Sequence, residues 1–135
     1  MQKIITMEPT SHLIIDATKK SPRIDFNAST GILQITGRCL PDDNHNFFAP
    51  ALDWANDYVS HPGTTTILII HLEYLQTGAS IKVLELIRKL MPLKDNGKEL
   101  IIRWGYEAED EDMLSTGTDI SSIVKFPFTF EVFGN

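Results

Sequence analysis

The sequence predicts a single α/β domain built on a mixed β-sheet, with an antiparallel hairpin at one edge of that sheet. Strand-like and helix-like segments alternate over the last two thirds of the chain, which is the pattern of crossovers between parallel strands. Nearer the N-terminus, two short segments of alternating polarity are separated by turn residues, as in a hairpin. The 135 residues suffice for one core and are too few for two. We therefore expect one domain over residues 1–135.

The first third of the chain is expected to form three strands. An apolar run at 13–15 is ended by a Lys-Lys-Ser-Pro break. Residues 23–26 alternate between polar and apolar side chains, residues 27–31 supply a turn, and the apolar pattern resumes at 32–36. The second and third strands therefore form the antiparallel hairpin.

A first helix is expected within residues 47–59, where apolar side chains recur at helical spacing. Pro50 lacks an amide hydrogen and cannot lie deep in a helix without the loss of a hydrogen bond. We therefore expect an irregular turn first and a regular helix from near Ala49. A His-Pro-Gly sequence at 61–63 ends the helix.

The middle of the chain predicts a buried strand followed by the clearest helix. Residues 65–70 form an uninterrupted β-branched and apolar run, typical of a strand with helices on either side. Over 80–91, apolar and charged residues occupy separate stripes, and Pro92 follows. The remaining elements are a strand, a helix interrupted by a glycine, and a last strand, expected at 100–104, 113–124 and 128–133. The predicted order is β-β-β-α-β-α-β-α-β.

Composition excludes several classes of function. Twelve Lys and Arg against 18 Asp and Glu give a formal net charge of −6, the wrong sign for a nucleic acid or an anionic membrane. A single cysteine leaves no intrachain disulfide and no multi-cysteine zinc site, and it fits a reducing compartment. The N-terminal residues lack a signal-peptide pattern, and no apolar run approaches the ~20 residues of a membrane span. We therefore expect a cytoplasmic protein.

Known catalytic and cofactor motifs do not occur. The sequence has no GxGxxG or GxxxxGK[ST] phosphate loop and no GxSxG elbow. The histidines lack HExxH spacing, so we expect them at the surface or the core edge. They are His12, His45, His61 and His71. His71, at the end of the predicted central strand, is the one histidine that we single out. Cys39 is interpreted as a small buried hydrophobe. We expect no enzymatic activity, no cofactor and no metal site.

An acidic run at 107–112 has five carboxylates in six positions. A metal site or a docking surface for a basic partner is one interpretation, although the DxDxDG calcium-loop pattern is absent. The other is a solvated helix start that complements the helix dipole, and we favour it.

The most informative stretch lies at 72–82, where a buried strand ends and an amphipathic helix begins. Ligands and partners of open α/β sheets usually bind at this end of a strand. Thr77 and Ser80 place two hydroxyls there. One interpretation is that either hydroxyl caps the helix. The other is a regulatory site, because a phosphate at a helix N-terminus meets free amides and a favourable dipole.

Several short motifs, each weak alone, occur in one order along the chain. They are SPRIDF at 21–26, GILQITGR at 31–38, PDDN at 41–44, FFAP at 47–50 leading to Trp54, LEYLQT at 72–77, IRWGYE at 102–107, DEDM at 110–113 and FPF at 126–128. In this order and spacing, the chain resembles the SiaC-like regulatory phosphoproteins of bacteria over nearly its whole length.

The resemblance implies a non-enzymatic switch. Such proteins are phosphorylated by a serine/threonine kinase on a threonine at a strand-to-helix junction and dephosphorylated by a PP2C-type phosphatase. The unphosphorylated form binds and activates a diguanylate cyclase, which links it to cyclic di-GMP and biofilm formation. On this resemblance Thr77 is the phosphoacceptor, with Ser80 as the alternative because the serines of the family motif are replaced here. The implied partner-binding residues are Tyr74, Leu75, Gln76, Gly78, Ala79, Ser80 and Lys82.

Other functions remain open at this point. The switch is similar in logic to the anti-sigma-factor antagonists, so the fold is expected to be STAS-like and the partner could be an anti-sigma kinase. A small enzyme with a metal in the acidic run, or an oligomeric scaffold held by the aromatic C-terminal strand, are further alternatives.

Overall fold

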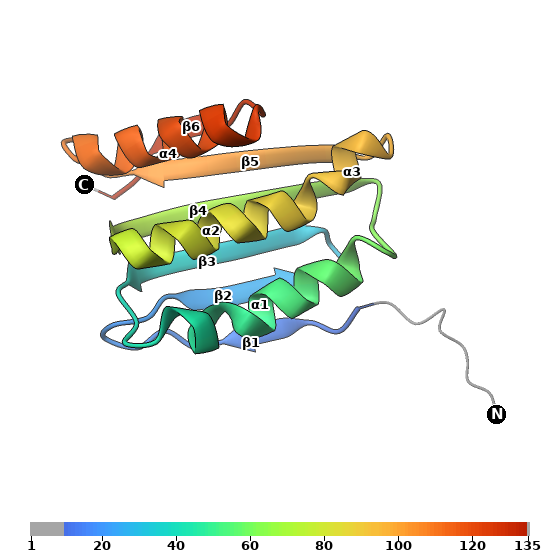
Figure 1. Cartoon of the computed structure of the whole chain (residues 1–135), viewed down its shortest axis with the longest axis horizontal. Helices are drawn as coiled ribbons and strands as arrows, with labels where there is room; N and C mark the ends of the chain where they lie inside the picture. The colour runs from blue at the N-terminus through green and yellow to red at the C-terminus, as the bar shows by residue number, and fades with distance from the viewer. Residues whose placement is uncertain (1–9, 135) are drawn as a thin grey trace.

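The computed structural model describes residues 10–134, in which a six-stranded sheet is covered by helices (Figure 1). The strands are β1 (Leu13–Ile15), β2 (Arg23–Asn27), β3 (Ile32–Cys39), β4 (Thr65–Leu75), β5 (Glu99–Tyr106) and β6 (Thr129–Val132). The helices are α1 (Asn44–Tyr58), α2 (Thr77–Leu90), α3 (Pro92–Asp95) and α4 (Glu111–Val124).

The sheet confirms the predicted fold class. Its strand order follows the sequence from β1 to β6. The pairs β1–β2 and β2–β3 are antiparallel, whereas β3 to β6 are parallel. The predicted order of elements is also confirmed, and α3 is an additional turn of helix between α2 and β5. None of the helices within residues 10–134 has the length and apolarity to cross a membrane.

The long helices α1, α2 and α4 lie on one face of the sheet (Figure 1). Each right-handed crossover advances by one strand in the same direction, which places every crossover helix on the same side. The expectation of helices on both sides of the central strand is therefore wrong. Burial along β4 alternates, with Leu68 and Ile70 buried and Ile67 and Ile69 half-buried on the other face. Neighbouring strands shield the half-buried Ile67 and Ile69, since Ile67 lies between residues of β3 and β5.

Helix α1 begins earlier than predicted. The Asp43 side chain caps it by accepting the amide of Asn46 at 3.1 Å, and Pro50 lies inside the helix. The proline leaves the carbonyl of Asn46 without its usual helical donor. Both residues are exposed, so water can bind that carbonyl. The prediction of a start near Ala49 overestimated the cost of a solvent-facing proline.

Trp104 of β5 fills the core beneath α4. Its side chain is fully buried, and Nε1 donates a hydrogen bond to the carbonyl of Met113 at 2.9 Å. A β-carbon at Gly117 would lie 2.5 Å from that same Nε1. Gly117 therefore does not interrupt α4 as predicted; it lets the helix approach the indole. The Phe128 ring stacks on the Trp104 indole, with ring centroids 6.0 Å apart.

A charged cluster on the helix-free side ties the short strand β6 to the sheet. Glu131 accepts hydrogen bonds from Arg103 Nε and Nη2, both at 3.0 Å, and pairs with His71 Nε2. Phe133 stacks on the His71 ring at 4.7 Å. The hydrogen bond from Arg103, together with that from His71, lowers the pKa of Glu131 below its ordinary 4.5. The histidine singled out in the sequence thus has a structural role.

Gly117→Ala should destabilise the protein, although alanine normally favours a helix over glycine. The added methyl group must displace the buried Trp104 ring, an overpacking cost of about 1–3 kcal/mol. Urea unfolding would measure the change. Ser122→Ala, on the exposed side of α4, is the matched control and should change stability little. A stabilised Gly117→Ala protein would show that α4 does not pack as described.

Glu131→Gln should lower the free energy of unfolding at neutral pH. The difference between wild type and variant should become smaller in acid. Because the folded-state pKa of Glu131 is depressed, its contribution is complete above the ordinary value of 4.5 and is lost as the pH falls through the folded value. Urea unfolding of wild type and variant from pH 7 down to pH ~3 tests this. The exposed Glu109→Gln serves as the control, and a pH-independent deficit in Glu131→Gln would contradict the prediction.

Candidate functional site

The N-termini of α1, α2 and α4 lie at one edge of the sheet, because each helix follows the carboxyl end of a parallel strand. Asp43 and Asp110 cap α1 and α4 by accepting backbone amides. Helix α2 differs. Its N-cap residue, Gln76, makes no side-chain bond to a helix amide, and its Oε1 accepts a hydrogen bond from Asn44 Nδ2 at 3.3 Å. Among residues 10–134, α2 is therefore the long helix at this edge whose first turn has no side-chain cap.

Thr77 is the first residue of α2, which begins three residues before the predicted start at 80. The alternative in which Thr77 or Ser80 caps the helix is wrong, since no side-chain cap bond forms. The Ser80 hydroxyl donates to the carbonyl of Thr77 at 2.6 Å. Thr77 is exposed, and its hydroxyl makes no hydrogen bond to any part of the chain that the structure describes. A modifying enzyme can reach this hydroxyl.

The structure places most of the implied partner-binding residues on one surface around Thr77. Tyr74 is 49% exposed, Gln76 and Gly78 are exposed, and Leu75 is half-buried. Ala79 does not belong to that surface. Its side chain is fully buried under α2, so a partner could not contact it without a shift of the helix.

Lys82 lies one turn further along α2 and is half-buried. Its Nζ pairs with Glu85 at 3.1 Å. This intrahelical pair neutralises the cation closest in sequence to Thr77. Lys82 is therefore not an unpaired cation beside the threonine.

Two hollows meet at Thr77. One, of about 400 Å³, is lined by the carboxylates of Glu73, Asp110 and Asp112. The other, of about 300 Å³, runs between α2 and α4. Thr77 and Thr116 line both. The sequence indicated the α2 side of this region but missed the α4 side, because no local signal shows that residues 116–123 lie opposite Thr77.

The acidic run behaves as a helix start. Asp110 Oδ1 accepts the amide of Met113 at 3.0 Å, and Glu111 and Asp112 occupy the first turn of α4. This confirms the favoured interpretation of the run. Among the residues from 10 to 134, no three His, Cys, Asp or Glu side chains are grouped so as to hold a metal ion.

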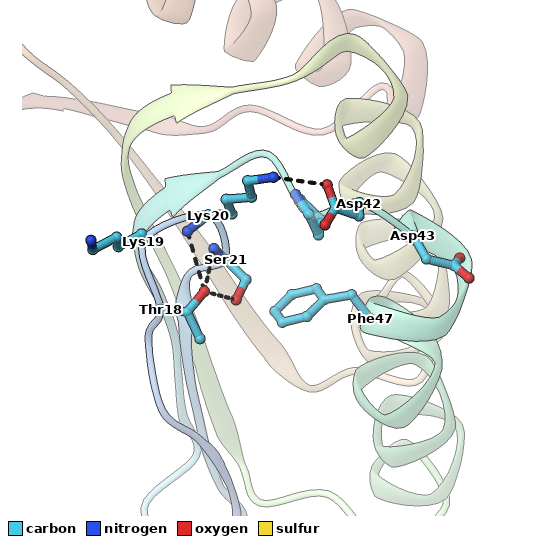
Figure 2. Close-up of a pocket in the computed structure, with 8 residues that line it drawn as sticks. Thr18, Lys19, Lys20, Ser21, Asp42, Asp43 and Phe47 are labelled. Carbon is cyan, nitrogen blue, oxygen red and sulfur yellow. Dashed lines mark hydrogen bonds and ion pairs between the residues drawn. The ribbon is translucent and has the colours of Figure 1, made fainter.

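A further hollow, of about 530 Å³, opens between the turn at 18–21 and the start of α1 (Figure 2). Phe47 points into it, and Lys20 Nζ reaches Asp42 at 3.1 Å. Both side chains of this ion pair are well exposed, so it contributes little stability. We assign no function to this hollow.

Cys39 ends β3 in the core. Its side chain is fully buried, and burial raises the pKa of the thiol to about 12. The thiol is therefore protonated and unreactive at neutral pH. This confirms its interpretation as a buried hydrophobe.

Comparison with known proteins gives a consistent result. Residues 15–133 match the family model described as SiaC family regulatory phosphoprotein. An uncharacterized protein of Pseudomonas aeruginosa strain UCBPP-PA14, PA14_02130, is 22% identical over 121 residues, which are 90% of this chain and 96% of that protein.

Solved structures show the same fold. One is the crystal structure of the diguanylate cyclase SiaD in complex with its activator SiaC from P. aeruginosa. The match has a TM-score of 0.82 and a sequence identity of 21%, and it covers 90% of this chain and 99% of that chain. Apo-SiaC from the same organism gives a TM-score of 0.82 and 21% identity, with 90% and 98% covered.

Proposed function

The chain belongs to the SiaC family of regulatory phosphoproteins, and from this premise we propose that it is a non-enzymatic partner-switch protein whose unphosphorylated form binds and activates a diguanylate cyclase. The premise confirms the family resemblance found in the sequence. SiaC is described as the activator of the diguanylate cyclase SiaD in the structure of their complex. This supports the choice of effector, because the present chain and SiaC share a fold. The output would then be cyclic di-GMP and biofilm formation. As a diguanylate cyclase consumes cytoplasmic GTP, we place the protein in the cytoplasm.

Thr77 is the proposed phosphoacceptor, and its accessibility is the observation that supports the switch most directly. Its hydroxyl is exposed at the first position of a helix whose amides lack a side-chain cap. Ser80, the alternative, is half-buried, and its hydroxyl is already bonded to the Thr77 carbonyl. A serine/threonine kinase would therefore modify Thr77 first, and a PP2C-type phosphatase would reverse the reaction.

A phosphate on Thr77 changes the surface without requiring the core to repack. It adds nearly two negative charges beside the uncapped amides of α2, where the helix dipole favours an anion. On the other side it faces the hollow lined by Glu73, Asp110 and Asp112. An effector that covers Thr77 must desolvate this concentration of charge, which weakens the complex.

The proposal is tested with the diguanylate cyclase encoded in the same genome. Wild type and Thr77→Ala should bind it alike and raise cyclic di-GMP production, whereas Thr77→Glu should bind at least tenfold more weakly, which corresponds to about 1.4 kcal/mol. Calorimetry and a cyclase assay give the two readouts.

Ser29→Glu adds the same charge at an exposed site in the β2–β3 turn and is the matched control. Ser80→Ala should bind as wild type. Equal binding by Thr77→Ala and Thr77→Glu would place the switch elsewhere. Mass spectrometry of protein treated with the cognate kinase separates Thr77 from Ser80 as the acceptor.

A further inference from the structure

We infer that β6 is a contact surface for a second copy of this chain, and that the β6 strands of two copies pair antiparallel across a two-fold axis. Strand β6 forms one edge of the sheet (Figure 1). No strand among residues 10–134 pairs with its outer side. Strand β4, which leads to Thr77, lies two strands further in. The inference therefore goes beyond the proposed function and does not depend on it.

The outer side of β6 carries unpaired backbone groups. The amide of Phe133 donates to the carbonyl of Tyr106 at 3.0 Å, so Phe133 and, by alternation, Glu131 turn their peptide groups toward β5. Phe130 and Val132 therefore turn their amides and carbonyls away from the sheet. Such groups at a strand edge are a template on which another strand can pair.

The side chains at this edge are apolar. Phe130 is 37% exposed and Val132 is 58% exposed, and both lie on the helix-covered side of the sheet. Glu131 points to the other side, where Arg103 Nε donates a hydrogen bond to its carboxylate at 3.0 Å. A charge on an edge strand discourages pairing. Because the charge of Glu131 is drawn toward β5 and neutralised there, it does not protect the edge.

A second copy fits this edge because β6 is complementary to itself. In an antiparallel pair, residues whose peptide groups face the partner strand lie opposite one another and exchange two hydrogen bonds. A two-fold axis at Glu131 sets Phe130 of each copy opposite Val132 of the other, so every outward group of β6 is used. The aromatic ring then packs on a β-branched side chain, which is a favourable cross-strand pair. The contact is closed, as in most homodimers.

The charges at the two ends of β6 favour the same arrangement. Lys125, the C-cap residue of α4, is exposed just before β6. At the other end, a β-carbon at Gly134 would lie 3.5 Å from Glu107 Oε2. Neither charged side chain forms an ion pair with another residue between 10 and 134. Antiparallel pairing brings the Lys125 end of each copy to the Glu107 end of the other, whereas parallel pairing would bring like charges together.

Sedimentation velocity of the full chain, over about a hundredfold range of concentration, tests the dimer. Wild type should change from monomer to dimer as the concentration rises. Val132→Pro removes one outward amide and leaves the bonds to β5 intact, because an edge strand tolerates a proline whose nitrogen faces solvent. Val132→Lys instead adds a charge at the edge. Both variants should raise the dissociation constant of the dimer at least tenfold.

Ile14→Lys is the matched control, since Ile14 is 50% exposed on β1 at the opposite edge of the sheet. Its dissociation constant should stay within twofold of the wild-type value. Circular dichroism and urea unfolding at low concentration should show that all three variants fold as monomers.

A charge exchange tests the antiparallel arrangement separately. Lys125→Glu and Glu107→Lys should each weaken the dimer, because each sets like charges together. The double variant should restore it. This rescue is a result that a purely structural role of either residue would not produce.

Several outcomes would overturn the inference. Wild type that stays monomeric over the whole range would leave the edge to an extended strand of another protein. A dimer that both Val132 variants leave unchanged, or that Ile14→Lys weakens equally, would place the contact elsewhere. A dimer that neither single charge variant weakens would exclude the antiparallel arrangement. Because these measurements use the chain alone, failure of the proposed function would not change their result.

Discussion

The parallel pairing of β3 to β6, with every crossover right-handed and in the same direction, is the constraint on which the rest of the structure depends. It sends the three long helices to one face and brings their N-termini to one edge of the sheet. It also sets α2 and α4 side by side, although Thr77 and Asp119 are far apart in the sequence. The candidate site is therefore a product of topology: strand β4 supplies its floor, and two crossover helices supply its walls.

The same constraint leaves the other face of the sheet without a helix over the region from 10 to 134, and the structure stabilises that face differently. Half-buried isoleucines of adjacent strands shield one another there. The ion pair of Glu131 with Arg103 and its hydrogen bond with His71 secure β6, which at four residues has few backbone hydrogen bonds of its own. Helix α4 packs on Trp104 of the adjacent strand, so the anchoring of β6 and the position of α4 support the same end of the sheet.

Sequence patterns predicted the class, the order of elements and the junction at Thr77, because hydrophobic periodicity and turn residues act locally. They did not predict the single helical layer, since the run at 65–70 has the same composition whether strand neighbours or a second helix cover Ile67 and Ile69. The start of α1 was misplaced because the tolerance of Pro50 depends on its exposure. The α4 wall of the site was missed for a related reason: Ile123 and Asp119 belong to an ordinary amphipathic helix until the fold places them opposite Thr77.

The contrast between the three helix N-termini bears on why a switch would lie at Thr77. Asp43 and Asp110 already place a carboxylate on the amides of α1 and α4, and a phosphate there would meet a like charge at bonding distance. Gln76 leaves the amides of α2 open at a cost on the order of 1 kcal/mol relative to a good cap. A phosphate on Thr77 would supply that missing acceptor. On the proposed mechanism, phosphorylation therefore stabilises the fold locally while it adds charge to the surface that the partner covers, so release of the partner needs no unfolding of the switch protein.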